Sequence, residues 1–343
     1  MTRTDECRTQ LGRKEGEKIV NRFFYCNTKH WAHAFIYPPD TTVVGNVEWW
    51  QTTAADAPSD DRKIYLETAL EDWKFDGVFH KKDALDVSVK APGGAPPNPN
   101  PDCTVTSDSR NGEHTIAEWE ANQRTLREYH TVGQDSSQGL GKDKVSLCAF
   151  ATYDRINGGA GSPRGGFTTG AIAYNEVRFD TSSYIDSKSV GRGVFNYALP
   201  VLQFSKSQPA HASVANHIWT AQYDPAMTVP KKEGKSIPGA PRSGKPLSRL
   251  YPGYDGPGGQ AENEYKLNRK ITADECAKLS RPTDYQCDEY PMAATWQGSG
   301  FGDGNYSLRM VPAGENSSAG GSLSAFYANQ RILHNDQFYV FVS

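Results

Sequence analysis

The sequence predicts a multidomain protein, with a large all-β, sandwich-like domain followed by a small α+β domain. The 343 residues are enough for two domains. Gly (32) and Pro (21) are plentiful and aromatic residues make up 11%, as in chains of short strands joined by turns, whose flat rings pack on pleated sheets. Strand-like patterns dominate the first two thirds of the chain, whereas helical and strand-like patterns alternate in the last third.

Apolar positions in the first domain recur with the period of two that is typical of half-buried strands. Ile64, Leu66 and Leu70 fall on one face of their segment, while Glu67 falls on the other. Turn-rich stretches separate such segments, and strands at this spacing favour a sandwich. One helical insertion is expected near residues 213–222. The predicted strands are 22–26, 32–37, 43–53, 63–75, 145–153, 171–179 and 194–204.

Residues 228–247 are interpreted as a linker between the first domain, residues 1–227, and the last domain, residues 248–343. The segment is rich in Pro, Gly and Lys, and such a composition buries too little apolar surface to fold. Its five cations far outnumber its single acidic residue, Glu233. We therefore expect an extended and mobile tether.

The last domain is predicted to follow the order helix, strand, loop, strand, helix, strand. Thr272 and Glu275 fit an S/T-x-x-E capping box, so a short helix is expected to begin there and to continue through Leu279. A glycine-laced loop separates the first two strands. The elements expected after this helix are strand 287–291, loop 298–304, strand 306–311, helix 316–330 and strand 337–342.

Charge and hydropathy exclude two broad classes of protein. The formal net charge is −3, so the whole chain is not a nucleic-acid binder by bulk electrostatics, although a local basic groove or a bound metal suffices for an enzyme. No apolar run reaches the length of about 18 residues that a membrane helix needs, so no membrane span is predicted. The chain opens without an apolar signal segment, and Met1 is interpreted as an expression start or as a cut within a larger exported precursor.

The six cysteines form three local groups along the chain. None has the Cys-x-x-Cys spacing of a zinc site, so we predict three disulfides and an oxidising compartment. The alternative is a cytosolic protein with free thiols. Pairing of neighbours is the simplest connectivity, and it joins Cys7 to Cys26, Cys103 to Cys148 and Cys276 to Cys287.

The acidic pair Asp288-Glu289 is the main candidate for chemistry. It lies between a predicted disulfide cysteine and the rigid Pro291, so its backbone should be held firmly. A carboxylate held in this way can take a proton from water. The structural alternatives are that Asp288 is a turn residue and that Glu289 only forms an ion pair with Arg309 or Arg331.

Residues further along supply other parts that phosphodiester hydrolysis needs. Arg309 lies on a predicted strand, and Glu315 and Asn316 stand at a predicted helix start, where oxygen ligands suit magnesium. A helix N-terminus and a neighbouring arginine stabilise the charge that builds on phosphorus. The structural alternative for Asn316 is a simple helix N-cap.

Three segments around these residues read CDEYPMAAT (287–295), SLRMVP (307–312) and ENSSAGG (315–321). Together they resemble the NucA/NucB family of secreted bacterial deoxyribonucleases. The resemblance covers about residues 246–343, and the tail after residue 323 is similar to the actinobacterial branch of that family. The first domain, with its DECR opening, is more loosely similar to the region that precedes such domains in large actinobacterial exported proteins.

The resemblance implies a compact ββα-metal nuclease core. In that superfamily a base, usually His, lies at the end of a strand three residues before a proline, which is the position of Asp288. NucA/NucB members also use Asp there. The resemblance further assigns Asn316 as a metal ligand and Arg309 as the arginine that meets the phosphate, and it carries over Glu289 and Glu315.

These roles imply a secreted, metal-dependent endonuclease that hydrolyses DNA with little sequence preference and leaves a 5′-phosphate. The implied cofactor is a divalent cation, Mg²⁺ or Mn²⁺. Ser317 departs from the arginine that is common after that Asn in the family, so substrate contacts are expected to differ.

The resemblance also implies a toxic or nutrient-scavenging role within an exported protein, with an immunity protein or a larger assembly as a partner. The basic segment 228–247 would then be a solvated tether or a cationic arm that holds DNA near the last domain. The alternative function is a non-enzymatic cell-surface or carbohydrate-binding β module with a degenerate nuclease-like tail.

Overall fold

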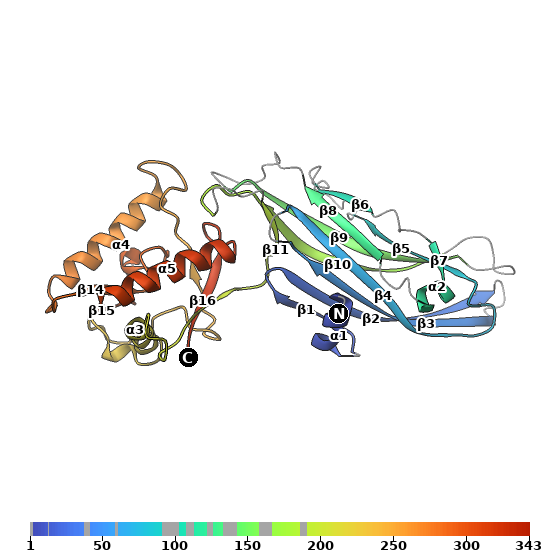
Figure 1. The fold of residues 1–343 in the computed structure, drawn as a ribbon, viewed down its shortest axis with the longest axis horizontal. Coiled ribbons are helices and arrows are strands. Elements are labelled where there is room, and N and C mark those ends of the chain that lie inside the picture. The colour runs from blue at the N-terminus through green and yellow to red at the C-terminus, as the bar shows by residue number, and fades with distance from the viewer. Residues whose placement is uncertain are drawn as a thin grey trace. The chain divides into compact units, whose positions relative to one another are not determined.

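The chain consists mostly of β-sheets with few helices (Figure 1). It divides into two compact units, one formed from most of the residues up to Ala198 and the other from Leu199–Ser343 with short stretches near residues 143 and 182–185. The computed structural model describes residues 3–12, 14–37, 42–58, 61–90, 103–107, 113–121, 126–132, 143–157, 167–185 and 191–343.

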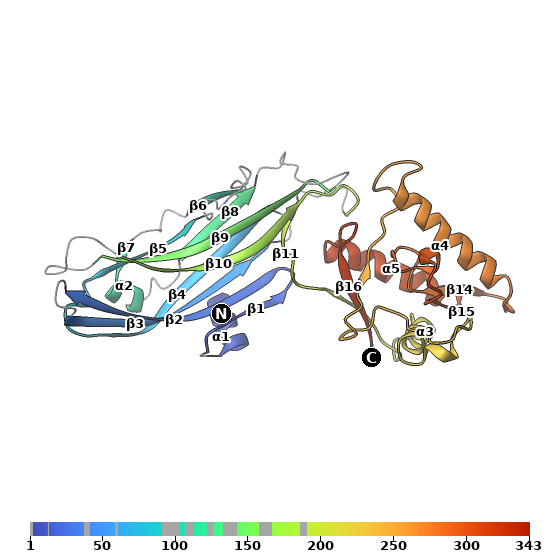
Figure 2. The same ribbon diagram turned by 180° about the vertical axis from the view of Figure 1, so that it is seen from behind.

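The first unit contains a six-stranded sheet, ordered β1-β2-β3-β4-β8-β6, and a five-stranded sheet, ordered β11-β10-β9-β5-β7. Every described strand pair in both sheets is antiparallel. Figure 2 shows the same sheets from behind. The elements are α1 (Arg3–Leu11), β1 (Gly16–Asn21), β2 (Phe24–Tyr37), β3 (Thr42–Asp56), β4 (Lys63–Phe75), β5 (Ala84–Lys90), β6 (Cys103–Ser107), β7 (Glu113–Thr115), α2 (Ile116–Ala121), β8 (Leu126–Val132), β9 (Val145–Asn157), β10 (Phe167–Asp180) and β11 (Arg192–Phe195).

The two sheets share a hydrophobic core, as in a β-sandwich. Ile64 and Leu66 of the first sheet pack in one cluster with Val177 and Phe179 of the second. The alternation predicted for β4 holds for its apolar face, but Glu67 on the other face is also buried because its carboxylate accepts hydrogen bonds from the backbone and side chain of a residue in α1. The helix therefore covers a face that we expected to be exposed.

Two strand predictions in this unit differ from the structure. The expected strands 22–26 and 32–37 lie largely in one long strand, β2, because its cross-strand pairing with β3 continues without interruption through the intervening residues. The expected strand 194–204 is instead two strands, β11 and β12 (Val201–Phe204), separated by a turn that closes at Ala198 and by Pro200. β12 belongs to the second unit.

All three predicted disulfides are present, and no described cysteine is free. In the first unit one disulfide ties helix α1 to strand β2 and another ties β6 to β9, and the third ties the end of α4 to a strand of the second unit. The pairs are Cys7–Cys26, Cys103–Cys148 and Cys276–Cys287. The neighbour connectivity predicted from the sequence is therefore confirmed.

The second unit has a three-stranded sheet, β12-β16-β13, and a two-stranded sheet, β14-β15, with three helices around them. β16 lies in the middle of its sheet, parallel to β12 and antiparallel to β13. The elements are α3 (Ala212–Tyr223), the 3-10 turn η1 (Pro225–Met227), β13 (Leu247–Ser248), α4 (Gln260–Cys276), β14 (Tyr285–Tyr290), the 3-10 turn η2 (Ser299–Phe301), β15 (Ser307–Pro312), α5 (Ala313–Asn329) and β16 (Gln337–Val342).

The segment expected to be an extended linker, residues 228–247, is folded into this unit. Ile237 and Leu247 are buried in its hydrophobic core, and the Lys235 ammonium donates to the Thr228 hydroxyl at 2.8 Å and to the Pro230 carbonyl at 2.6 Å. The compact unit therefore begins near residue 199, not at the expected boundary of 247/248. Average composition misled the prediction because a few well-placed apolar residues suffice to anchor a loop.

The helices of this unit also correct the prediction in part. α4 ends at Cys276, so Thr272 and Glu275 lie in its last turns and not at its start. α5 begins at Ala313, three residues before the expected start, whereas β16 has the predicted bounds. The succession β14, β15, α5 is the strand–strand–helix order that the resemblance implied.

Candidate active site

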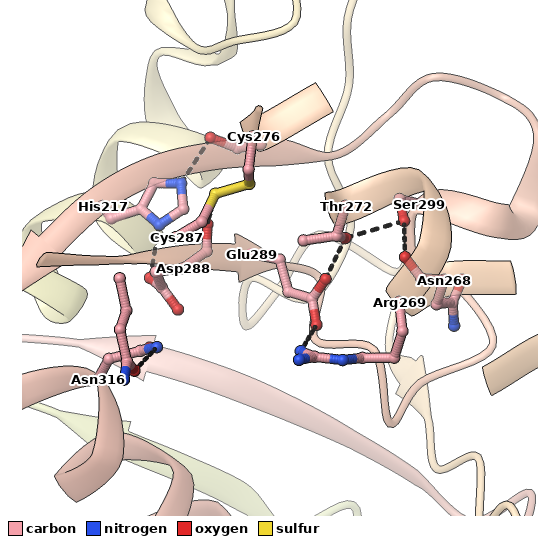
Figure 3. Close-up of a disulfide and its surroundings, with 12 residues drawn as sticks. His217, Asn268, Arg269, Thr272, Cys276, Cys287, Asp288, Glu289, Ser299 and Asn316 are labelled. Atoms are coloured by element: carbon pink, nitrogen blue, oxygen red, sulfur yellow. Dashed lines mark hydrogen bonds and ion pairs between the residues drawn. A yellow bond between two sulfur atoms is a disulfide. The ribbon is translucent and has the colours of Figure 1, made fainter. Parts of the chain in front are cut away.

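The strand pair β14–β15 places two neighbouring carboxylates on opposite faces. Asp288 and Glu289 are successive residues of β14, so their side chains point to opposite sides of the ribbon. Asp288 meets α3, whereas Glu289 meets α4 (Figure 3). Arg309 is the cross-strand partner of Asp288 in β15.

Asp288 begins a buried chain of hydrogen bonds. Its Oδ2 lies 2.6 Å from Nδ1 of His217 in α3, and Nε2 of His217 lies 2.7 Å from the Ser307 hydroxyl oxygen in β15. His217 is 0% exposed. The tautomer in which Nδ1–H donates to the carboxylate and Nε2 accepts from the serine hydroxyl satisfies both contacts. The hydrogen bonds thus fix the orientation of the Asp288 carboxylate.

Ser307, His217 and Asp288 are hydrogen-bonded in the same order as the triad of a serine hydrolase. Here, however, the serine is buried and the aspartate is the accessible member. Ser307 is 1% exposed, and it does not line the neighbouring cavity, whereas Asp288 does. The end of the chain that solvent or substrate reaches is therefore the carboxylate. This arrangement presents a base and buries the hydroxyl that a serine hydrolase would use as its nucleophile.

The cavity beside Asp288 has a volume of about 260 Å³. Its walls come from α3, α4, β14 and α5, so residues far apart in the sequence meet there. Apolar side chains form much of the wall, and two carboxylates, one arginine, one amide and one tyrosine supply its polar groups. The lining residues are Phe204, Val214, Ile218, Tyr265, Arg269, Cys287, Asp288, Glu289, Met292, Ala293, Ala294, Asn316, Ala319, Gly320 and Leu323.

Glu289 also lines the cavity, but its oxygens already have partners. The Thr272 hydroxyl donates to Oε2, and the Ala293 amide donates to Oε1 at 3.0 Å. The Arg269 guanidinium lies 3.5 Å from Oε1, and this is the ion pair that the sequence assigned to Arg309 or Arg331. Burial raises the pKa of Glu289 above its ordinary value, and the Thr272 hydrogen bond and the Arg269 charge oppose that shift.

Arg309 is held on the α3 side of the strand pair. Its Nη2 lies 3.4 Å from the Thr220 hydroxyl, a long hydrogen bond that constrains the side chain weakly. Arg309 is absent from the described residues that line the cavity. The structure therefore places it opposite Asp288 in the register without bringing it to the cavity.

Glu315 and Asn316 are adjacent at the start of α5, but they face different neighbours. Oε2 of Glu315 accepts the Ser213 backbone N–H at 2.5 Å, and Oε1 accepts the Ser213 hydroxyl at 3.1 Å. Glu315 therefore caps the first turn of α3, the helix that carries His217. Asn316 instead lines the cavity and donates its amide to Gln286 Oε1 at 3.1 Å.

The residues present suit a water-rich metal site and not a complete protein cage. Among the residues described, no group of three or more His, Cys, Asp and Glu is placed to hold a metal ion. The amide N–H of Asn316 donates to Gln286, and one oxygen of Asp288 contacts His217. Each residue therefore has one oxygen without these partners beside the cavity. Magnesium, which retains several waters and takes few protein oxygens, fits such a donor set.

Two strands, a following helix, a carboxylate with one open oxygen and a nearby side-chain amide are the parts that the sequence resemblance led us to expect. Consistently, residues 254–341 match the family model described as deoxyribonuclease NucA/NucB. The second unit therefore contains a NucA/NucB-type nuclease domain. The match spans about a quarter of the chain and includes Asp288 and Asn316 but not His217. No curated protein and no solved structure matches the chain.

Proposed function

We propose that the second unit is a metal-dependent endonuclease that hydrolyses DNA with little sequence preference. The observation that carries this proposal is Asp288, which has one oxygen fixed by the buried His217 and the other open to a cavity within a deoxyribonuclease-family domain. A base held in one orientation beside the reacting phosphate contributes to catalysis both by proton transfer and by positioning.

In this mechanism the open oxygen of Asp288 accepts a proton from the attacking water. The His217 hydrogen bond fixes the orientation of this carboxylate, and Asp288 lines the cavity in which the water would lie. In-line attack then breaks the bond to the 3′-oxygen and leaves a 5′-phosphate. Contacts to the backbone carry no sequence information, so little preference among sequences is expected.

Asn316 is the residue proposed to hold a divalent cation, Mg²⁺ or Mn²⁺, through the oxygen that its hydrogen bond to Gln286 leaves open. Such a cation supplies positive charge at the phosphate when it is bound. Glu315 was expected to help in binding it, and its contacts with Ser213 favour a role in supporting α3. Arg309, weakly held by Thr220, is proposed to turn toward the phosphate and offset the developing negative charge.

We further propose that the protein acts outside the cell that makes it. Three disulfides support this because such bonds persist in oxidising compartments. None of the described helices is long and apolar enough to cross a membrane. The actinobacterial relationship, a toxic or nutrient-scavenging role and an immunity protein or larger assembly remain parts of this proposal. A degenerate tail is less well supported, since the base, its histidine and the amide are all retained.

A plasmid-nicking assay tests the proposal. The wild-type protein should nick supercoiled plasmid with Mg²⁺ or Mn²⁺ and should stop in EDTA, while Asp288→Ala and Asn316→Ala should lose nearly all activity. Asp303→Ala is a matched control, because Asp303 is an exposed acidic residue that does not line the cavity. Intact plasmid with the wild-type protein and either metal, or equal nicking by Asp288→Ala, would show that the mechanism is wrong.

A further inference from the structure

A second cavity, with a volume of about 650 Å³, adjoins the one beside Asp288. The two cavities share the wall residues Arg269, Cys287 and Asn316, so they lie next to each other on the second unit. The second cavity is built from the last turns of α4, the residues after it, and the strand pair β14–β15. A polymer bound over Asn316 would therefore extend from one cavity into the other.

The two cavities differ in charge. Asp288 and Glu289 line the first, whereas no described aspartate or glutamate lines the second, which contains the arginines Arg269 and Arg281. Arg281 is exposed, and no described carboxylate lies within ion-pair distance of it. An arginine without a carboxylate partner at the edge of a cavity is available for bidentate hydrogen bonds to a phosphate.

The remaining wall of the second cavity combines apolar side chains with the polar residues Thr272, Gln286 and Asn316. Leu279 and Met310 pack beside the Cys276–Cys287 disulfide and are partly buried, so they form a firm surface. A nucleotide combines an anionic phosphate with the flat, weakly polar faces of a sugar and a base. The cavity offers a surface for each of these parts.

We propose that this second cavity binds the nucleotide that adjoins the cleaved bond, with its phosphate at Arg281 and its sugar and base against Leu279 and Met310. The proposal rests on the proposed nuclease function, and it assigns the side of the catalytic cavity along which the substrate strand runs. Arg281 then acts in binding and does not contact the reacting atoms.

Binding without cleavage separates this proposal from the hydrolytic mechanism. A fluorescent single-stranded DNA of about 12 nucleotides, which is long enough for several phosphate contacts, is titrated with the protein in EDTA at several salt concentrations. Arg281→Ala should weaken binding several-fold. It should also lower the slope of log affinity against log salt by about 0.7, so that the loss of affinity between 0.05 and 0.2 M salt becomes about 2.6-fold smaller.

Lys278→Ala is the matched control, because Lys278 is an exposed cation nearby that pairs with Glu275 and does not line the cavity. Arg281 is exposed, so its replacement should leave the melting temperature unchanged. In cleavage assays Arg281→Ala should raise KM for long DNA without lowering kcat, and it should not affect a dinucleoside monophosphate, which has no second phosphate.

Equal salt slopes for Arg281→Ala, Lys278→Ala and wild type would overturn the proposal, as would an equal effect on the dinucleoside. Loss of binding in EDTA by Arg281→Ala alone supports the site even if the wild-type protein cleaves nothing. In that outcome the proposed function fails while the second cavity stands as a DNA-binding site.

Discussion

The two faces of β14 carry adjacent carboxylates with opposite surroundings. On the α4 side, three donors occupy the oxygens of Glu289, and burial raises its pKa. On the α3 side, a single donor, His217, holds one oxygen of Asp288 and leaves the other open. The difference teaches that the number of oxygens left without partners, and not the presence of a carboxylate, separates a catalytic candidate from a structural one.

The largest expected effect is the contrast between Asp288→Asn and Glu289→Gln. Asp288→Asn keeps the shape of the side chain but removes the base, so the initial rate of plasmid nicking should fall by about 10²–10⁴-fold. Glu289→Gln should lower that rate far less, because Glu289 has no open oxygen. A larger loss for Glu289→Gln than for Asp288→Asn would reverse the assignment of the two faces.

The next effect is that of His217→Gln, which breaks the series of hydrogen bonds from Ser307 to Asp288. We expect the nicking rate to fall by about a hundredfold, because a base that is held in the wrong position transfers protons poorly. We also expect a loss of about 1–3 kcal/mol in the free energy of unfolding, because the buried Ser307 hydroxyl loses its hydrogen-bond partner. The loss should appear in kcat and not in KM for DNA, because the change disturbs the orientation of Asp288 and not the DNA-binding surface.

The neighbouring exposed Asn216 provides a control for that experiment, and Asn216→Ala should leave kcat unchanged. If His217→Gln lost stability but kept its kcat, then His217 would only fill the core and would not hold the base.

A smaller effect is expected for Glu315→Ala, which removes the cap of α3. Urea denaturation should show a loss of about 0.5–2 kcal/mol, with a modest decrease in nicking because His217 is on that helix. A metal-ligand role predicts the reverse pattern, in which stability is unchanged and the metal concentration needed for half-maximal nicking rises steeply.

The smallest effect concerns the pH dependence of stability through Glu289. Its pKa in the folded protein is above the ordinary value of 4.5, so in the interval between these values the folded chain retains a proton that the unfolded chain has released. This contribution to stability is complete below about pH 4.5 and is lost as the pH rises through the folded-state value. Melting temperatures from pH 4 to about 7 should show this decline in the wild type and not in Glu289→Gln.

Local patterns predicted much of the second unit. β16 follows from strand alternation, and the Cys276–Cys287 pair follows from its short separation in sequence. α4 was missed because its start follows a Gly- and Pro-rich run and its N-cap is Gly259, a weak signal. The capping-box match at Thr272 then predicted a helix start at a point where α4 nearly ends. In the structure the Thr272 hydroxyl does not cap a helix but donates to Glu289.

The candidate site was predicted only where its parts are close in sequence. Asp288 and Asn316 came from motifs, and both line the cavity. His217 could not be found this way, because 71 residues separate it from Asp288 and a single histidine in a predicted helix has many explanations. The assignment of residues 1–227 to the first domain hid it further, since α3 packs in the second unit.

The parallel pairing of β12 with β16 limits which segment of the gene could carry a complete nuclease domain from one protein to another by recombination. Val201 pairs with Tyr339, so the two ends of the second unit are held together by one sheet. A recombination event that moved only the family-matched stretch 254–341 would leave behind β12, α3 and the histidine that holds the base. We therefore expect the inherited, transferable piece to start near residue 199, which is 55 residues before the family-matched stretch begins at residue 254.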